Sequence, residues 1–398
     1  MRQPRIVDLR VHLVSAVIPQ PEQVMSGAGH KLSRQAALIE VILDNGLTGI
    51  GPCSFGSVSF ELTFVRTLVD NVFKPAVLGR DPFATEAIWM ELYYGLVIRT
   101  YGSRGVGVAI LSAIDIALWD VKGKALDVPV YALLGGPVRG AVPAYASSVY
   151  WSTIDESVAS ARTFVDRGYG ALKVKVGGGF REDIERIEAI VAAVGPDVQV
   201  MVDANLAYSR DTALRVGREL DRLHVLFFEE PISLDDVEGH GLLAAQLDTM
   251  IATGENLYTR WGFLPYIDAG VDVVQPDSSR AGGISEARRV AELAAARNRL
   301  VAPHTFSDAF SLVANLHLAL AVDAVFILEV DETYNPLMRE LVHNPTHVVD
   351  GEIAPPTAAG LGLELDRDWV SAHQYTGGQG IGPGVRPGTR SQASGGRE

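Results

Sequence analysis

Three acidic residues, Asp203, Glu229 and Glu255, each come at the end of a short apolar segment in the second half of the chain. Carboxylates that converge from neighbouring strands repel one another unless a cation lies among them. Oxygen ligands with open coordination positions are typical of Mg²⁺, whereas zinc would call for Cys or His on the same segments. Together the three residues predict a Mg²⁺ site, although any one of them alone could be a solvated loop charge or half of an ion pair.

Candidate bases flank this predicted site. Lys173 and Lys175 are two residues apart, so on a strand both point to the same face, and their mutual repulsion is expected to lower the pKa of Lys175 toward a value suited to proton abstraction. Asp277 and His304 end the next two apolar segments, and a carboxylate bonded to one ring nitrogen would fix the tautomer of His304 and raise its basicity. Taken singly, the lysines would be ion-pair partners and the histidine a core residue, so the prediction of two bases rests on the combination.

Eight short apolar segments position these side chains, and amphipathic helical segments such as 184–194 and 285–296 lie between them. The apolar segments are 142–147, 171–176, 198–205, 225–231, 249–255, 272–277, 300–304 and 325–330. Parallel βα units closed into a barrel are expected, because the strand count is eight and the polar residues fall at the strand ends, where barrel active sites lie. An open doubly wound sheet is the alternative.

The first part of the chain has a different pattern. Segments 6–15 and 36–44 alternate as strands do, Asn45-Gly46 is a hairpin-turn dipeptide, and apolar residues follow helical spacing from about 61 to 126. The Pro- and Gly-rich segment 16–33 between the two strands predicts a mobile loop. We therefore expect an α+β capping domain over residues 1–130, a barrel over 131–349, a segment of about 350–376 that packs back on the cap, and a disordered tail over 377–398.

Composition restricts the class of protein. The formal net charge of −14 argues against a nucleic-acid surface, and the apolar runs are too short for a membrane helix. The single cysteine, Cys53, excludes an internal disulfide, and the first residues lack the pattern of a secretory signal. A cytoplasmic protein without nucleic-acid or membrane partners is expected.

At this point the sequence resembles the enolase superfamily, and within it the mandelate racemase branch, over residues 6 to about 370. The motifs that carry the resemblance are LSAIDIALWD (111–120), LKVKVG (172–177), VDAN (202–205), FEEP (228–231), DDVEGH (235–240), GEN (254–256), PDSSRAGG (276–283), PHTF (303–306) and LEVD (328–331). Each motif is short, but their order and spacing are specific. The resemblance implies a modified (β/α)7β TIM barrel with an N-terminal α+β capping domain, and a homo-oligomer between a dimer and an octamer.

The resemblance also implies roles for the residues already named. Asp203, Glu229 and Glu255 would bind Mg²⁺, with Asn205 and Glu230 as supporting polar groups. Lys175 and the His304–Asp277 dyad would stand on opposite faces of the substrate, Lys173 would tune Lys175, and Glu329 would donate a hydrogen bond to the substrate carboxylate. Muconate-lactonizing members carry a lysine on the sixth strand, where this chain has Asp277.

The implied reaction is abstraction of the proton α to a carboxylate through an enediolate. If the enediolate expels a β-hydroxyl, the enzyme is a sugar-acid dehydratase that forms a 2-keto-3-deoxy acid, and this outcome is favoured by analogy with the branch. If the proton returns on the opposite face, the enzyme is a racemase or epimerase of a 2-hydroxy acid. A scaffold protein without activity and a hydrolase on another barrel remain as alternatives. The retained acids and bases argue against the first, and the absence of a His-x-His pair among nine histidines argues against the second.

Residues for substrate recognition are expected in the cap and after the first barrel strand. The loop 16–33 and its flank offer His30, Lys31 and Arg34 for a polar or anionic distal end of the substrate, or these charges are simply solvated. A second candidate loop covers residues 53–59. Ser147 and Tyr150 follow the first barrel strand closely enough to contact substrate.

Overall fold

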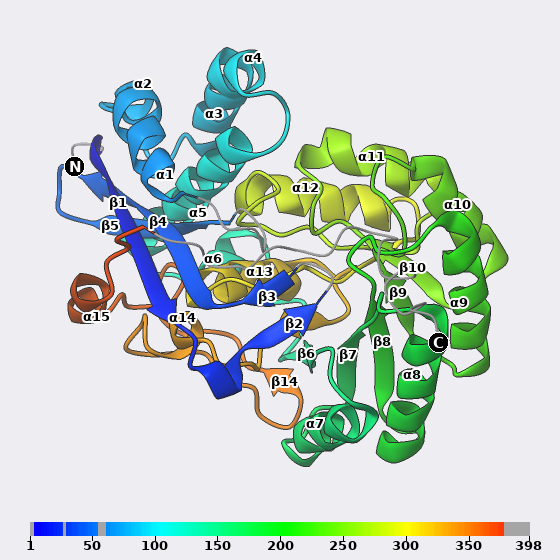
Figure 1. The fold of residues 1–398 in the computed structure, drawn as a ribbon. Helices are drawn as coiled ribbons and strands as arrows, with labels where there is room; N and C mark the ends of the chain where they lie inside the picture. Colours follow the sequence, from blue (N-terminus) through cyan, green and yellow to red (C-terminus); the bar gives the residue numbers. More distant parts are fainter. Residues whose placement is uncertain (1–3, 27–28, 55–60, 378–398) are drawn as a thin grey trace.

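The computed structural model describes residues 4–26, 29–54 and 61–377. A helix-covered barrel lies beside a smaller part built from the N-terminal strands and helices (Figure 1). The predicted tail falls outside the described residues except for Gly377, and so does most of the candidate loop 53–59. In the described part of the chain, no helix is long and apolar enough to cross a membrane.

The N-terminal sheet has three antiparallel strands in the order β1 (Ile6–Val17), β4 (Ser33–Leu43) and β5 (Thr48–Cys53). The predicted Asn45-Gly46 turn joins the last two, with Gly46 at a φ of 86°, a conformation that glycine adopts without a steric penalty. The antiparallel meander predicted from the alternating pattern is confirmed.

Helices cover one face of this sheet (Figure 1). They are α1 (Thr63–Leu68), α2 (Lys74–Val77), α3 (Thr85–Met90), α4 (Ile98–Thr100) and α5 (Val106–Leu126), and π-helical turns at Val69–Phe73 and Glu91–Val97 connect the short ones. Helix α5 lies directly on β5, because a Cβ at Gly51 would stand 1.9 Å from the carbonyl oxygen of Ala113. The glycine lets the helix backbone touch the sheet.

Between β1 and β4 the chain forms a short 3-10 turn (Gln20–Glu22) and a hairpin of β2 (Val24–Ser26) and β3 (Gly29–Lys31). The hairpin reaches from the cap toward the barrel (Figure 1), and the amide of Trp151 donates to the carbonyl of Met25 at 3.2 Å. Part of the predicted loop therefore forms a hairpin that contacts the barrel, and the mobility of segment 16–33 stays a prediction.

The barrel consists of eight parallel strands followed, except for the last, by helices. The strands are β6 (Val142–Val149), β7 (Ala171–Lys175), β8 (Gln199–Asp203), β9 (Phe227–Glu229), β10 (Met250–Thr253), β11 (Val273–Val274), β12 (Leu300–Val301) and β13 (Leu328–Val330). They pair in the order β12-β11-β10-β9-β8-β7-β6-β13, and a parallel bridge between Val301 and Val325 joins the two ends. The prediction of a (β/α)7β barrel is confirmed, and the open sheet is excluded.

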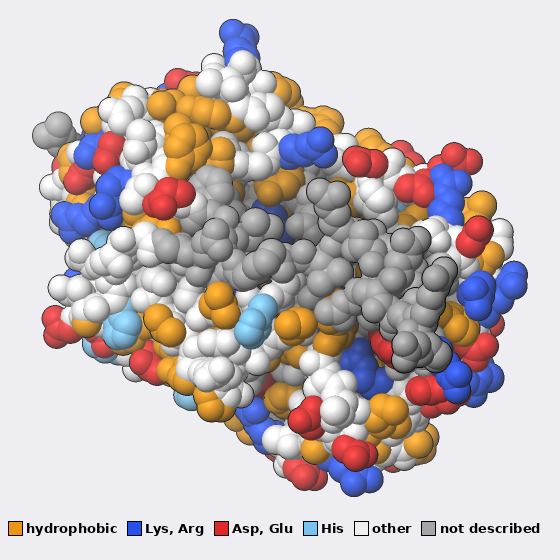
Figure 2. Space-filling model, viewed as in Figure 1, with side chains coloured by type: hydrophobic (Ala, Val, Ile, Leu, Met, Phe, Trp, Pro, Cys, Tyr) orange, Lys and Arg blue, Asp and Glu red, His pale blue; other side chains and the backbone are white. Residues whose placement is uncertain are grey.

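Seven helices surround the strands. They are α7 (Ile154–Asp166), α8 (Phe180–Val194), α9 (Arg210–Arg222), α10 (Val237–Gln246), α11 (Thr259–Ala269), α12 (Gly283–Ala295) and α13 (Ala309–Ala321). Helix α7 begins with the capping box of Thr153 and Glu156, and Asp308 caps α13. On the face in Figure 2, basic and acidic side chains are interspersed over the barrel helices, as on a solvated surface.

Apolar side chains fill the lower part of the barrel interior, each strand region contributing one. This cluster is Tyr145, Ala171, Met201, Phe227, Ala252, Val273, Ala302 and Ile327. Packed in this way, the interior is closed beneath the charged residues at the carboxyl ends of the strands. Those residues therefore face the cap and cannot contact water from the other end of the barrel.

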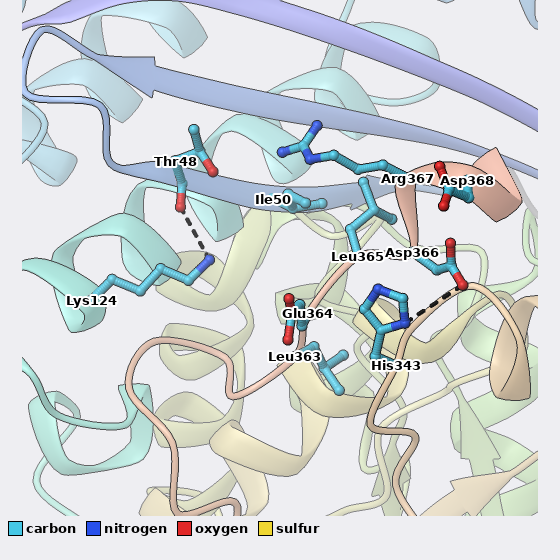
Figure 3. A pocket seen from close by; sticks show the side chains of 10 residues that line it. All are labelled: Thr48, Ile50, Lys124, His343, Leu363, Glu364, Leu365, Asp366, Arg367 and Asp368. Carbon is cyan, nitrogen blue, oxygen red and sulfur yellow. Dashed lines mark hydrogen bonds and ion pairs between the residues drawn. The ribbon is translucent and has the colours of Figure 1, made fainter. Parts of the chain in front are cut away.

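The last described segment returns to the cap. Helix α6 (Val130–Leu133) leads from the cap into the barrel. After the barrel, the described part of the chain continues with α14 (Pro336–Arg339), β14 (Glu352–Ile353) and α15 (Arg367–Ala372). The amide of Tyr375 then donates to Leu13 O at 2.9 Å. A hollow remains at this seam (Figure 3), where His343 contacts Asp366 at 3.5 Å and Lys124 donates to Thr48 O at 3.0 Å. The limits of the two domains stay predictions.

Replacing Gly51 by Ala should destabilise the protein by about 2 kcal/mol, because the new methyl group would force α5 away from β5. Equilibrium urea denaturation of Gly51→Ala would measure the loss. The matched control is Gly262→Ala, which is helical with open space around its Cβ and should leave stability unchanged or raise it by up to about 1 kcal/mol. Equal stability of the two variants would contradict the close packing of helix and strand.

Candidate active site

The three predicted metal ligands meet at the carboxyl end of the barrel. Asp203 and Glu229 are the last residues of β8 and β9, and Glu255 comes two residues after β10. One carboxylate oxygen from each lies within 4.8 Å of the other two, and all three side chains are buried. Adjacent parallel strands in register bring the acids together, as the sequence predicted.

The chemistry of this cluster fits a divalent cation. Glu229 Oε1 is buried and has no hydrogen-bond partner among the described residues. Burying an unpaired carboxylate oxygen costs free energy, and a bound cation would remove that cost. Burial, opposed by Lys173, raises the pKa of Glu229 to about 8, and the neighbouring carboxylate of Asp203 adds to the rise. A hard cation with oxygen ligands would hold all three acids in their ionised form.

Two amide side chains complete the acid cluster, and the sequence reasoning assigned neither. Gln275 Nε2 donates to Glu229 Oε2 at 2.7 Å, and Asn256 Nδ2 donates to Glu255 Oε1 at 3.1 Å and to both oxygens of Glu230. Gln275 lies two residues before Asp277, so the period of a strand was a signal that both point into the barrel. Asn256 lies inside the quoted motif GEN, next to a predicted ligand.

The two lysines of β7 point to the same face, and both are buried. Lys173 Nζ lies 2.6 Å from Glu229 Oε2 and 2.8 Å from Glu329 Oε1. Lys175 forms an ion pair with Asp203, its direct neighbour in the β7–β8 register. Each lysine is thus paired with one of the acids at the mouth.

This pairing corrects the prediction that Lys173 lowers the pKa of Lys175 on balance. Burial is the largest influence on Lys175 and lowers its pKa, and Lys173 lowers it further. The carboxylate of Asp203 outweighs both, so the pKa of Lys175 lies above its ordinary value. The prediction considered only the lysine two residues away and missed the carboxylate on the next strand.

His304 is held in one orientation. Its Nδ1 donates to Asp277 Oδ2 at 2.9 Å, and the amide and hydroxyl of Ser279 bind the other oxygen of Asp277 at 2.8 and 2.5 Å. Asn315 Nδ2 donates to the carbonyl of His304 at 3.0 Å. The free ring nitrogen Nε2 faces the acids, 3.3 Å from Glu255 Oε2.

The charge around His304 favours its protonated form. Burial lowers the pKa of His304, but the carboxylates of Glu255, Glu329 and Asp277 raise it above the ordinary value. The expectation that Asp277 makes the imidazole more basic agrees with this direction. An imidazole with one nitrogen fixed and the other facing the mouth can accept or deliver a proton there.

Glu329 lies between a lysine and a backbone amide. Burial alone would raise its pKa, but Lys173 and His304 lower it to about 2, and the carboxylate accepts a hydrogen bond from the amide of Thr305 at 2.9 Å. In this arrangement Glu329 is a counter-charge of Lys173, 2.8 Å from its Nζ. The predicted hydrogen bond from Glu329 to the substrate carboxylate stays a prediction.

The residues predicted to bind substrate lie in different surroundings. The amide and side chain of Asn205 donate to Asp203 at 2.8 and 3.2 Å, so this residue supports a candidate metal ligand. Ser147 is buried on β6, and its hydroxyl has no hydrogen-bond partner among the described residues. Tyr150 follows β6, its ring 6.4 Å from that of Phe306.

His30 and Lys31 belong to β3 of the hairpin that extends from the cap. Lys31 Nζ lies 4.3 Å above the ring of Phe306, two residues after His304. Through this ring Lys31 contacts the barrel. The role of His30 and Lys31 in substrate binding stays a prediction.

Comparison with known families agrees with this architecture. The mandelate racemase / muconate lactonizing enzyme N-terminal domain family matches residues 8–135, and the enolase C-terminal domain-like family matches residues 156–369. The chain belongs to the enolase superfamily, in its mandelate racemase branch. It is an enzyme of this superfamily, and the resemblance seen in the sequence is confirmed.

Curated relatives of this enolase-superfamily chain act on sugar acids or their lactones. It is 32% identical to D-galactarolactone cycloisomerase of Agrobacterium fabrum, over 92% of this chain and 97% of that protein. It is 35% identical to arabinonate dehydratase of Saccharolobus solfataricus (77% and 82%) and 34% identical to L-talarate/galactarate dehydratase of Salmonella typhimurium (87% and 86%).

Solved structures with the same fold include racemase-like proteins. A protein of Bordetella bronchiseptica RB50 named for mandelate racemase has a TM-score of 0.93 and 42% identity, with 96% of this chain and 97% of that chain covered. A racemase of Streptomyces coelicolor A3(2) with bound magnesium has a TM-score of 0.83 and 28% identity, with 93% and 100% covered. These names describe those proteins. Dehydratases occur among the curated relatives and racemases among the solved structures.

A divalent cation should stabilise the folded chain, because it would offset the repulsion among the three acids. At a free concentration a hundred times its dissociation constant, Mg²⁺ should add about 2.7 kcal/mol to the free energy of unfolding. Thermal melting with Mg²⁺ or with a chelator would measure this as a rise in Tm. Asp203→Asn should lose the rise, whereas Glu238→Gln, an exposed acid on α10, should keep it. If the Tm of the wild-type protein does not change when Mg²⁺ is added, the proposed metal site is contradicted.

Proposed function

We propose that this enzyme removes the proton α to a substrate carboxylate and dehydrates a sugar acid to a 2-keto-3-deoxy acid. The observation that carries the proposal is the placement of Lys175 and His304. They come from β7 and β12, which β6 and β13 separate, yet Lys175 contacts Asp203 and His304 Nε2 lies 3.3 Å from Glu255. A carboxylate held at the acid cluster would therefore have a basic group on each of two sides.

Asp203, Glu229 and Glu255 would hold Mg²⁺, and the magnesium in the racemase neighbour supports this choice of ion. When bound, Mg²⁺ supplies positive charge that stabilises the negative charge developing on the substrate carboxylate as the α-proton leaves. Lys173 Nζ lies within ion-pair distance of Glu229 and Glu329, so its ammonium group would add a fixed positive charge beside the acid cluster. These charges matter because a proton next to a carboxylate is too weakly acidic for an amine or imidazole alone.

The residues then have separate roles in dehydration. Lys175, in its neutral form, takes the α-proton, and the C–H electron pair forms the enediolate. The C–O bond to the β-hydroxyl breaks, and His304, held by Asp277 with Nε2 toward the mouth, delivers the proton that lets the hydroxyl leave as water. The resulting enol tautomerises to the 2-keto acid.

Racemisation or epimerisation of a 2-hydroxy acid is the second candidate, and the same observation favours it. With bases on two sides, a proton taken by one can be replaced by the other on the opposite face of the enediolate. The dehydratases among the curated relatives favour the first candidate, since fold alone does not choose between these reactions.

A screen of a sugar-acid library for 2-keto products tests the proposed reaction directly. We expect at least one aldonic or aldaric acid to give a 2-keto-3-deoxy product in the presence of Mg²⁺. A polarimetric screen of 2-hydroxy acids beside it tests the second candidate. Optical inversion without 2-keto product would replace the first candidate by the second, and no change of any acid in either screen would overturn both.

Removing either base should lower kcat by at least about a hundredfold, because each group moves a proton in the proposed sequence. The variants are Lys175→Ala and His304→Asn, assayed with the substrate found by the screen. Incubation in D₂O should still exchange the α-proton in the variant that retains the abstracting base.

Matched controls are Lys122→Ala, on α5 of the cap, and His343→Asn, at the seam hollow of Figure 3. Both should keep wild-type rates. Normal turnover by both Lys175→Ala and His304→Asn would show that these residues are not the bases. Turnover without any α-proton exchange would show that no enediolate forms.

A further inference from the structure

Each of the two proposed bases lies beyond the end of a strand pairing. The pairing of β6 with β7 ends at Val174, the residue before Lys175. The pairing of β11 with β12 ends at Val301, and His304 comes three residues later. On these sides a parallel ladder does not bind the backbone of either base, so other donors must take its place in the buried barrel.

Arg186, on α8, joins the two strand ends at Lys175. Its Nη1 donates to the carbonyl of Tyr150 at 3.0 Å, and its Nη2 donates to the carbonyl of Lys175. Tyr150 follows the last residue of β6, so one guanidinium continues the connection between β6 and β7 where their own pairing stops. The side chain is buried, and the planar fork of a guanidinium suits two acceptors at once.

Asp183, at the start of α8, fixes the chain that follows this base. Its Oδ2 accepts hydrogen bonds from the amides of Gly177 and Gly179 at 3.0 and 2.9 Å, and from the hydroxyl of Tyr208 at 2.6 Å. Its Oδ1 lies 3.6 Å from the guanidinium of Arg186. Helix α8 thus binds both the carbonyl of the base and the amides that come just after it.

Asn315, on α13, has the corresponding place at the other base. Its Nδ2 donates to the carbonyl of His304 at 3.0 Å, and its Oδ1 accepts from the amide and the hydroxyl of Ser278 at 3.0 and 2.6 Å. Ser278 follows Asp277, the partner of the His304 ring, so one buried amide holds both halves of the dyad. Asn315 and Arg186 each come eleven residues after the base that they hold.

We propose that Arg186 and Asn315 are positioning residues, each of which controls the proton transfer of one base. The inference rests on the proposed function, in which Lys175 takes the α-proton and His304 delivers a proton to the leaving hydroxyl. Each side chain binds the backbone of its own base, so its loss would let that base move while the other stays in place. A displacement of about 1 Å can cost on the order of a hundredfold in rate.

Two rates measured in D₂O separate the two proton transfers. Deuterium uptake at the α-carbon of recovered substrate reports abstraction and return of the proton, and formation of the 2-keto acid reports the whole reaction. Arg186→Lys should lower both rates together, by at least about tenfold, because abstraction comes first. Asn315→Ser should lower product formation by a similar factor and keep deuterium uptake at or above the wild-type rate, because the enediolate then returns to substrate more often. KM and the rise in Tm with Mg²⁺ should stay close to their wild-type values in both variants.

The matched controls are Arg181→Lys, on the exposed face of α8, and Asn71→Ser, on the surface of the cap. Both should keep wild-type rates. An equal loss of deuterium uptake and product in both Arg186→Lys and Asn315→Ser would show a general loss of structure and overturn the proposal. A variant with wild-type rates would overturn it for the residue that was changed.

Amide hydrogen exchange without substrate separates this inference from the proposed function. In Arg186→Met the amides of Gly177 and Gly179 should exchange at least about tenfold faster, and in Asn315→Leu the amide of Ser278, each without a change at the other base. If the wild-type protein dehydrates a sugar acid but these amides exchange as before, the inference falls and dehydration stands. If the amides respond but no acid is dehydrated, dehydration is rejected together with the control of proton transfer, and the anchoring of the two strand ends remains.

Discussion

The mutual repulsion of Asp203, Glu229 and Glu255 is the constraint on which the rest of this structure depends. Three buried carboxylates within 4.8 Å of one another cannot all be ionised without nearby positive charge. The chain supplies part of it through Lys173 and Lys175, which pair with two of the acids, and a divalent cation would supply the rest. In the proposed reaction, the same charges that offset the repulsion would also acidify the substrate carbon, so stability and catalysis would depend on one arrangement.

The barrel and the cap serve this constraint in different ways. Apolar side chains such as Tyr145, Met201 and Phe227 close the barrel beneath the acids and keep them in a medium of low polarity, where each charge acts strongly. Above them, Arg34 fixes the cap to the barrel through Asp331, close to Phe306. The groups of the proposed reaction all belong to the barrel, and the cap contacts the barrel beside them.

The ionisation states at the mouth follow from neighbours on different strands rather than from sequence neighbours. Lys173 reaches Glu329 across the barrel and lowers the pKa of that carboxyl, and Asp203 lies beside Lys175 in the β7–β8 register and raises the pKa of that lysine. A lysine must lose its proton before it can act as a base, and a carboxylate beside it opposes that loss. Binding of substrate and cation at the acid cluster would change the charged neighbours of Lys175 and His304. The ligands of the site would therefore set the pKa values of the two proposed bases.

The sequence by itself determined the barrel, the meander of the cap and the convergence of the acids, because strand periodicity and the position of polar residues at strand ends are local properties that parallel pairing turns into proximity. Only the tertiary structure decided what each charge contacts. It paired Arg34 with Asp331, placed Lys31 over the ring of Phe306, and set Glu329 against Lys173. These outcomes depend on distances between segments far apart in the chain, and electrostatic energies change steeply with such distances.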